Sequence, residues 1–294
     1  MDISIKVTYK SEGLQKLRKA AGLSQSQLAD LAGIKVQVLQ QYERGARDIN
    51  GAKLPTLLKI CNALECRLAD IITDEETLVR ALLEVNRLYK PDGQPVVFDL
   101  QLEAEVLGCG LVWADDCPPS VSSHPLADTM TVPCRCTLPT AVRMPMVLSA
   151  MRRMKEAVGD TTALYGLLCG PFTLASHLRG NDIFMDMFDD EDYVKDLLGF
   201  CADCAKRMSD LYLDAGMDVI AVVDPLVSQI SSDHFEEFLS APYTELFRYL
   251  REEKQAFSSF FVCGNATRNI EVMCRTAPDS ISVDENVDIL AAKA

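Results

Sequence analysis

The stretch "DVIAVVDP", residues 218 to 225, decides how most of this sequence folds. Its five central residues are all apolar and four of them are β-branched, which is typical of a strand buried on both faces. An aspartate and a proline follow immediately and end the run. The pattern therefore predicts an interior strand whose last residues carry a polar group to one edge of a sheet.

Four similar runs lie elsewhere after residue 91, and amphipathic helical patterns separate them. The runs are "PVVFDL" (95–100), "TALYGLLCG" (162–170), "FSSFFVCG" (257–264) and "SISVDE" (280–285), and the longest helical patterns cover 191–216 and 232–254. Apolar strands that alternate with such helices predict a parallel sheet covered by helices, either a barrel or an open doubly wound sheet. In both architectures the chemistry lies at the carboxyl ends of the strands. That rule selects Asp99, Gly170 with Pro171, Asp224, Cys263, and Asp284 with Glu285.

The first part of the chain has a different pattern, with short helices that mostly end at glycine. Ser24 and Gln27 form a Ser-x-x-Gln capping box before a helix, and Gly33 allows a sharp turn before the next one. Helices this short are marginal alone, so they must share a core. The residues expected in it are Leu14, Leu17, Leu28, Leu31, Ile34, Leu39, Leu57 and Ile60.

Charge is distributed unevenly between these two parts. The whole chain of 294 residues carries a net charge of -14, but residues 1–73 have 11 basic against 7 acidic residues and the rest has 18 against 36. No apolar run reaches the roughly 18 residues that a membrane span needs, and the first ten residues are charged where a signal peptide is apolar. We expect a cytoplasmic protein without membrane contact. Eleven cysteines, an odd number in a long chain, favour reduced thiols.

A helical segment and a turn separate the two parts. "TDEETLVRALLEVNRLYKPDG", residues 73–93, has one amphipathic helical pattern and ends in Pro-Asp-Gly. We therefore divide the chain into a helical domain at 1–73, a linker at 74–91 and a (β/α) domain at 92–294.

The stretch "LRKAAGLSQSQLADLAGIKVQVLQQYERGAR", residues 17–47, resembles the helix-turn-helix of the Cro/C1-type (XRE) repressors. The resemblance implies double-stranded DNA as a partner of residues 1–73, with residues 35–43 as the recognition helix in the major groove. Gln37 and Gln41 lie four apart on one face and can bond adenine, unless they are only a solvated face.

The same resemblance implies further roles in this helical domain. Val36 would touch a thymine methyl, Gln25 would bind phosphate, and Lys35 and Arg44 would contact the DNA backbone. Arg18 and Glu43 correspond to a buried ion pair and are interpreted as structural.

The second part resembles the uroporphyrinogen decarboxylase superfamily, which includes corrinoid and coenzyme M methyltransferases. The resemblance rests on "VVFDLQLEAEVLG" (96–108), "GPFTLASHLRG" (170–180), "DAGMDVIAVVDP" with "SDHFEEFLSAPY" (214–243), and "FVCGN" with "DSISVDENVDI" (261–289). It implies a (β/α)8 barrel with its site at the carboxyl face. The implied catalytic residues are Asp99, Asp224 and His177, and the implied substrate-binding residues are Asp99, Gly170, Pro171 and Asp284.

Two chemistries follow from this resemblance. In the decarboxylases the position of Asp99 binds pyrrole nitrogens and stabilises a protonated pyrrole, but His177 and Pro225 stand where that branch has tyrosine and serine. In the methyltransferases a His-x-Cys pair and a later cysteine bind zinc, which holds a thiolate nucleophile. The resemblance implies Cys263 as a metal ligand here, but Phe261 stands in the histidine position, and one ligand out of three does not make a zinc site.

Length suggests that the barrel is incomplete. Eight βα units usually need about 250 residues, whereas residues 91–294 show five strands. The expected fold is thus α/β: a small all-α helix-turn-helix domain followed by a partial or truncated (β/α)8 barrel. A decaying barrel, a fragment, or a second chain that completes the sheet would each explain it, and exposed strand edges favour a homodimer.

We therefore expect sequence-specific DNA binding joined to a barrel that binds a corrinoid, a tetrapyrrole or a methylated small molecule, with a corrinoid protein as a possible partner. The alternative is an enzyme, a cobalamin-dependent methyltransferase or a decarboxylase, with zinc or a corrinoid as cofactor and an accessory DNA-binding domain. Among the smaller signals, Cys201 and Cys204 are interpreted as core rather than a redox pair. Cys134 with Cys136 is a weak site for a soft metal, and His124 is expected to form a structural hydrogen bond.

Overall fold

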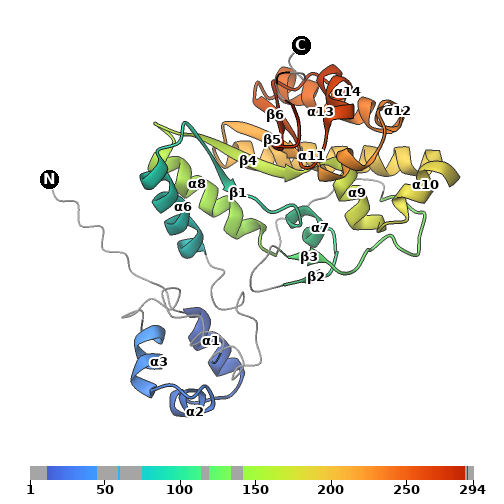
Figure 1. Ribbon diagram of the computed structural model, residues 1–294. Coiled ribbons are helices and arrows are strands. Elements are labelled where there is room, and N and C mark those ends of the chain that lie inside the picture. Colours follow the sequence, from blue (N-terminus) through green and yellow to red (C-terminus); the bar gives the residue numbers. More distant parts are fainter. Residues whose placement is uncertain are drawn as a thin grey trace. The chain divides into compact units, whose positions relative to one another are not determined.

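The computed structural model of the chain describes residues 12–44, 59, 75–113, 119–133, 142–288 and 290 (Figure 1). Two compact units are present. One comprises Met1–Ala81 with Trp113–Cys117, and the other comprises Leu82–Val112 with Pro118–Ala294.

The first unit contains the helices α1 (Glu12–Ala20), α2 (Gln25–Leu31) and α3 (Val36–Glu43). The predicted capping box at the start of α2 is confirmed: Ser24 Oγ accepts from the Gln27 N–H at 3.2 Å, and Gln27 Oε1 accepts from the Ser24 N–H at 2.8 Å. Gly33 follows α2 with φ +58°, a conformation that glycine adopts without strain and that lets the chain turn sharply into α3.

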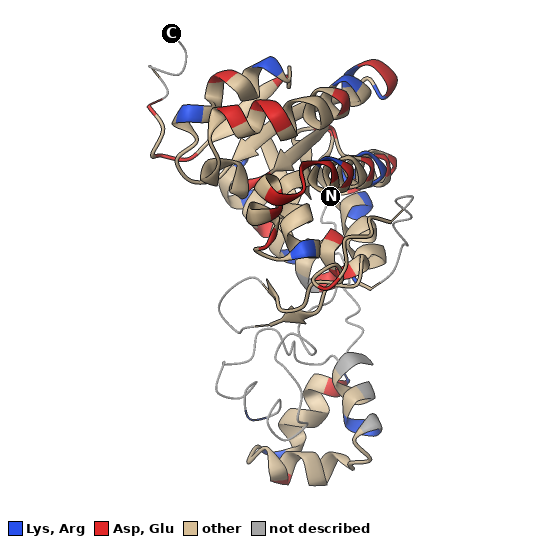
Figure 2. Ribbon diagram, turned by 90° about the vertical axis from the view of Figure 1, so that its right-hand side faces the viewer, with Lys and Arg blue, Asp and Glu red and all other residues tan. Residues whose placement is uncertain are grey.

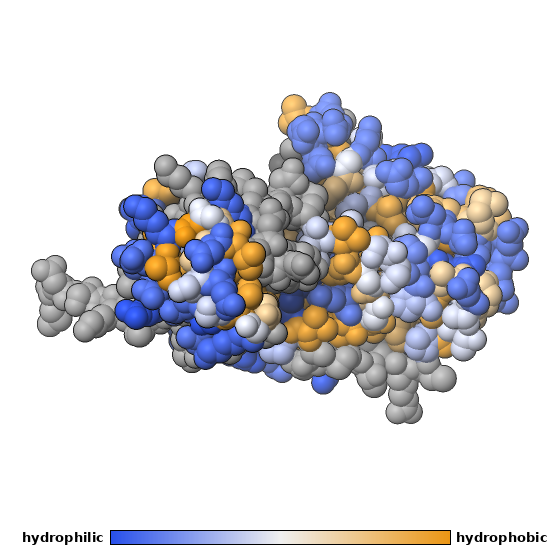
Figure 3. Space-filling model, turned by 90° about the horizontal axis from the view of Figure 1, so that it is seen from below, coloured by the Kyte–Doolittle hydropathy of each residue, from blue (hydrophilic) through white to orange (hydrophobic). Residues whose placement is uncertain are grey.

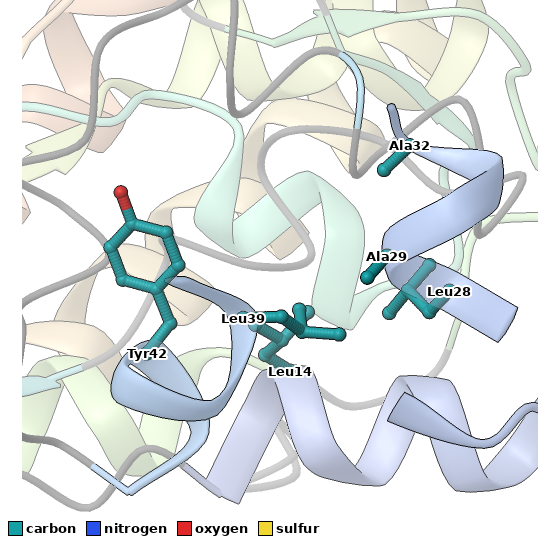
Figure 4. Close-up of a cluster of buried hydrophobic side chains, with 6 residues drawn as sticks. All are labelled: Leu14, Leu28, Ala29, Ala32, Leu39 and Tyr42. Carbon is teal, nitrogen blue, oxygen red and sulfur yellow. The ribbon is translucent and has the colours of Figure 1, made fainter. Parts of the chain in front are cut away.

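A small core joins these helices, and Figure 4 shows its buried side chains. They are Leu14, Leu28, Ala29, Ala32, Leu39 and Tyr42, with the partly buried Leu17, Leu23, Ile34, Val36 and Val38 around them. The predicted ion pair is confirmed beside this core. Arg18 Nε donates to Glu43 Oε1 at 2.6 Å, and Arg18 Nη2 donates to Glu43 Oε2 at 3.0 Å. This two-pronged contact ties α1 to α3.

One predicted core residue was wrong. Leu31 is 64% exposed, because the small residues Ala29 and Ala32 form the buried face of α2 together with Leu28, and Leu31 falls outside that stripe. Leu57 and Ile60 lie outside the described residues.

The second unit is built on a parallel sheet of β1 (Gly93–Val97), β4 (Ala163–Cys169), β5 (Val219–Val223), β6 (Phe257–Val262) and β7 (Ser280–Val283). The strands lie in the order β1-β4-β5-β6-β7, so each is added beside the preceding one in chain order (Figure 1). A doubly wound sheet reverses its order near the middle, and this sheet does not. The five predicted strands and the partial-barrel fold are confirmed, with β1 and β7 as the edges of the described sheet.

Helices precede and connect these strands. They include α6 (Glu75–Tyr89), α7 (Leu102–Val106), α8 (Met144–Val158), α9 (Pro171–Arg179), α10 (Ile183–Asp189), α11 (Glu191–Asp214), α12 (Ser232–His234), α13 (Ser240–Arg248) and α14 (Ile270–Arg275). Between α12 and α13, and again after α13, the run continues as the π-helical turns η2 (Phe235–Leu239) and η3 (Tyr249–Glu253); η1 (Pro225–Gln229) and η4 (Thr267–Asn269) are 3-10 turns. A short hairpin pairs β2 (Leu111–Val112) with β3 (Ser120–Val121). In the part of the chain that the structure describes, no helix has the length and apolar character to cross a membrane.

The sheet has two different faces. On one face Tyr212 of α11 packs so closely over Gly166 of β4 that an added Cβ would lie 2.7 Å from the tyrosine ring. On the other face a second apolar cluster forms from alternate strand residues. Its members are Leu167, Ala221 and Val223, with Leu100, Tyr165, Phe261 and Cys263 packed against them. This second face corresponds to the interior of a barrel.

Candidate functional site

The recognition-helix residues predicted for DNA contact lie mostly on an exposed surface. Lys35, Gln37, Gln41 and Arg44 are all exposed, whereas Val36 is half-buried against the small core. In the space-filling view of Figure 3 the visible, described surface of this unit is largely hydrophilic with apolar residues between. Gln37 and Gln41 are separated by a little more than one helical turn, so both amides lie on the same side of α3.

Gln25, the predicted phosphate contact, takes part in a network between α2 and α3. Its Nε2 donates to Glu43 Oε2 at 2.7 Å, and its Oε1 accepts from Gln40 Nε2 at 3.3 Å. An amide nitrogen has two hydrogens, and the bond to Glu43 uses one of those of Gln25, so the phosphate contact stays a prediction. The bond from Gln40 also joins α3 to α2.

In the barrel unit, Asp224 follows β5 and is fully buried. Its Oδ2 accepts the Phe172 N–H at 2.9 Å and the Tyr243 hydroxyl, and its Oδ1 accepts the Thr173 N–H at 3.1 Å and the Thr173 hydroxyl at 2.6 Å. Burial raises the pKa of Asp224 to about 6, although the bonds from Thr173 and Tyr243 act in the opposite direction. The carboxylate is positioned to hold the start of α9 in place. Its predicted catalytic role stays a prediction.

Gly170 and Pro171 form the turn between β4 and α9, beside Asp224. A Cβ on Gly170 would lie 2.4 Å from both Cβ and Oδ2 of Asp224. The first N–H groups of a helix commonly bind an anionic ligand. Here the Asp224 carboxylate occupies that place, so a ligand anion does not have the start of α9 available.

Asp99 follows β1 and forms an ion pair with Arg143, the N-cap residue of α8. The Asp99 carboxylate also accepts the Gln101 N–H at 2.9 Å, and Arg143 Nε contacts Glu105 Oε2 at 2.7 Å. All three charged side chains are less than a fifth exposed. Sequence reasoning selected Asp99 but missed Arg143 and Glu105.

His177 lies on α9 and is half-buried. Burial lowers its pKa to about 4, with a further lowering from His124, so the imidazole is neutral at neutral pH. Its Nδ1 is buried without a hydrogen-bond partner among the described residues. Its backbone carbonyl accepts from His124 Nδ1 at 2.8 Å, which confirms the structural hydrogen bond expected of His124.

Cys263 and Asp284 follow β6 and β7. The Gly264 N–H donates to Asp284 Oδ2 at 2.6 Å, and burial, followed by the charge of Asp284, raises the pKa of the Cys263 thiol. Next to Cys263, the ring of Phe261 meets that of Phe98 edge to face with centroids 6.4 Å apart. Phe98 is 51% exposed, so this pair of rings presents apolar surface at the carboxyl edge of the sheet.

These residues do not fit a zinc ion. A zinc site needs at least three protein ligands, and within the described ranges no group of three or more His, Cys, Asp or Glu side chains is arranged to hold a metal. Cys263 thus has an aromatic neighbour where a histidine ligand would be needed. Cys134 and Cys136 lie outside the described residues.

The cysteines of α11 differ from one another. Cys201 is buried and free, as the core interpretation predicts. Cys204 is also buried but is disulfide-bonded, so the expectation of reduced thiols was wrong there. Composition alone cannot detect such a bond, because it depends on the distance and direction between two side chains.

The fold and the position of these residues define an α/β protein with a partial barrel, preceded by a helix-turn-helix. The model of the uroporphyrinogen decarboxylase family matches residues 58–294, and a helix-turn-helix model matches residues 14–71. The chain belongs to the uroporphyrinogen decarboxylase family and carries a helix-turn-helix of the XRE type at its N-terminal side.

Relatives come from both branches of the family. A methylcobamide:CoM methyltransferase MtbA of Methanosarcina mazei is 34% identical over 67% of this chain and 59% of its own length. A uroporphyrinogen decarboxylase of Nostoc punctiforme is 22% identical over 74% of this chain and 64% of its own length. The chain therefore spans about three fifths of the length of these relatives.

A solved structure shares the fold. A methyltransferase from Methanosarcina mazei superposes with a TM-score of 0.67 at 23% identity, covering 89% of this chain and 75% of the other. This likeness supports the barrel-type architecture of the second unit.

Proposed function

We propose that this protein is a sequence-specific DNA-binding regulator whose barrel binds a corrinoid or a methylated small molecule and adjusts DNA binding in response. The observation that carries the proposal is an intact helix-turn-helix, with its Arg18–Glu43 pair and exposed Gln37 and Gln41, on a chain of this family. In the barrel, Phe261 stands where the methyltransferase pattern needs a zinc ligand. Binding of a small molecule in the barrel does not need a zinc-coordinating residue at this position, whereas activation of a thiol by zinc does.

Charge supports DNA binding through residues 1–73. Residues 1–73 are net basic, while the rest of the chain has twice as many acidic as basic residues. Figure 2 shows Asp and Glu spread over the helices of the barrel unit. Such a surface repels phosphates, so we assign the DNA contacts to residues 1–73.

The carboxyl edge of the sheet supports ligand binding. Aromatic rings at Phe98 and Phe261 offer apolar area, and Asp99, Arg143 and Glu103 supply polar groups nearby. In this proposal the ligand changes the arrangement of two copies of the chain on DNA, because repressors of this kind bind as dimers to half-sites about one helical turn apart.

The test is an operator selection with the full chain, followed by binding to the selected DNA with and without hydroxocobalamin, methylcobalamin and 2-mercaptoethanesulfonate. A selected motif whose affinity changes with one of these compounds supports the proposal. Sequence-independent binding, equal for scrambled DNA at matched salt, contradicts it.

A second candidate function is methyl transfer, which the 34% identity to a methylcobamide:CoM methyltransferase favours. It predicts that the purified protein consumes methylcobalamin in the presence of 2-mercaptoethanesulfonate and carries zinc that is lost in Cys263→Ser. A metal-free, folded protein without this activity would exclude it.

A further inference from the structure

Glu103 lies on α7, the short helix that follows β1 at the carboxyl edge of the sheet. The residue is only 1% exposed, and its Oε1 accepts the N–H of Cys169, the last residue of β4, at 2.9 Å. Its Oε2 is buried and has no hydrogen-bond partner within the described part of the chain. The carboxyl therefore joins the ends of two neighbouring strands and keeps one oxygen without a partner.

The surroundings of Glu103 determine its protonation state. Burial raises its pKa to about 8, and the charge of Asp99 raises it further, while the Cys169 N–H and Arg143 act in the opposite direction. At neutral pH the acid thus keeps its proton. Because Oε1 accepts a hydrogen bond, the proton belongs on Oε2, which becomes a buried O–H donor. The other titratable groups around this edge are Cys169, Tyr212, Glu105 and His177.

Two of the other donor groups at this edge already bind carboxylates. Arg143 binds the carboxylates of Asp99 and Glu105, and Asp224 occupies the first N–H groups of α9. These groups are therefore occupied by acids of the chain itself, whereas Glu103 Oε2 has no acceptor among the described residues. A buried donor without an acceptor is unfavourable, and a bound acceptor relieves that cost.

We propose that Glu103 is a ligand-binding residue that donates a hydrogen bond from Oε2 to an acceptor oxygen of the small molecule held at the carboxyl ends of β1 and β4. The acceptor is an amide or sulfonate oxygen, the two kinds that a corrinoid and a thiol sulfonate present. This inference rests on the proposed ligand binding by the barrel, and it names a residue that takes part in it.

The test uses the full chain and isothermal titration with two probes, hydroxocobalamin for amide oxygens and 2-mercaptoethanesulfonate for a sulfonate. Wild type, Glu103→Gln, Glu103→Leu and the control Glu156→Gln, an exposed position on α8, are compared at about pH 6.5 and about pH 9. Wild-type affinity should fall roughly tenfold at the higher pH, because a group with a pKa of about 8 is then about one-tenth protonated.

The variants separate a donor from a merely structural acid. Glu103→Gln keeps an N–H donor that does not titrate, so it should bind within about threefold of wild type at the lower pH and keep that affinity at the higher pH. Glu103→Leu should bind about 5- to 150-fold more weakly at both pH values. In infrared difference spectra, a protonated-carboxyl band that is absent from Glu103→Gln should shift when the probe binds.

The remaining outcomes each support or refute the role of Glu103. The probe that binds shows whether the acceptor is an amide oxygen or a sulfonate oxygen. If Glu103→Gln binds as poorly as Glu103→Leu, or if wild-type affinity does not change with pH, the role of Glu103 is refuted while ligand binding by the barrel stands. If neither probe binds the wild type, both the role of Glu103 and the proposed ligand classes fail.

Discussion

Gly170 and Asp224 approach each other so closely that a Cβ on the glycine would lie 2.4 Å from the aspartate Oδ2. The contact joins the end of β4 to the end of β5, and the same carboxylate caps α9 through Phe172 and Thr173. The carboxyl edge of the sheet is thereby held by a buried acid that has no exposed surface. The requirement for glycine at this turn comes from space, since its φ is -65°.

Gly170→Ala should therefore destabilise the barrel unit. The added methyl group would displace Asp224 or the β4–α9 turn, and overpacking of this kind costs about 1–3 kcal/mol. Urea unfolding of the full chain measures the loss. Gly199→Ala is the matched control, because nothing lies within 4 Å of its added Cβ in the middle of α11, and it should stabilise by about 0.5–1 kcal/mol. Equal effects of both changes would disprove the steric explanation.

Tyr243→Phe removes one of the bonds to the Asp224 carboxylate. A hydrogen bond to a charged group contributes about 1.5–3 kcal/mol, and we expect that loss in the free energy of unfolding near neutral pH. The folded pKa of Asp224, about 6, is above its ordinary 3.8, so its contribution is fully present below 3.8 and is lost as pH rises through 6. The tyrosine bond lowers the pKa of Asp224, so its removal should raise the folded pKa further. The stability of the variant should then fall with rising pH over a wider pH range than that of wild type. A pH-independent difference from wild type would contradict this.

His177→Phe should change the acid side of the stability profile. The folded pKa of His177 is about 4, below its ordinary 6.5, so its contribution is present above 6.5 and is lost as pH falls toward 4. This loss amounts to roughly 3 kcal/mol at most. Because Asp224 titrates with the opposite sign in an overlapping range, the informative quantity is the difference between wild type and His177→Phe. A difference that does not vary between these pH values would mean that the imidazole is not buried.

Gln37→Ala and Gln41→Ala should each weaken binding to the selected operator by about 1–3 kcal/mol and relax the preference at one base pair. Lys35→Ala should instead weaken binding to all sequences and lower the salt slope by about one. Fluorescence anisotropy across a salt series distinguishes the two effects. If the glutamine variants lose affinity equally for operator and scrambled DNA, these side chains are only a solvated face.

Much of the fold was predictable from local pattern. The five apolar runs became β1, β4, β5, β6 and β7 because each combines apolar content with a polar or glycine end. The capping box and Gly33 are equally local, since they depend on neighbours within a few residues. Leu31 failed because the pattern did not show that Ala29 and Ala32 define the buried face of α2.

The candidate site was predictable only in part. Strand ends selected Asp99, Asp224, Cys263 and Asp284, but not the partners that determine what they do. Arg143 lies 44 residues from Asp99 in the sequence, and Tyr243, on α13, lies 19 residues from Asp224. Glu103 was quoted within a motif but not selected, because its burial and its unpartnered oxygen depend on β4, which comes much later in the chain.

The most direct test of the central claim is the affinity of the full chain for its selected operator, measured with and without saturating cobalamin or 2-mercaptoethanesulfonate. A ligand-sensing regulator should bind the operator well above scrambled DNA, and one ligand should change that affinity about 5- to 150-fold. An affinity that is the same with every ligand, together with methyl transfer from methylcobalamin, would contradict the regulator and support an enzyme with an accessory DNA-binding domain.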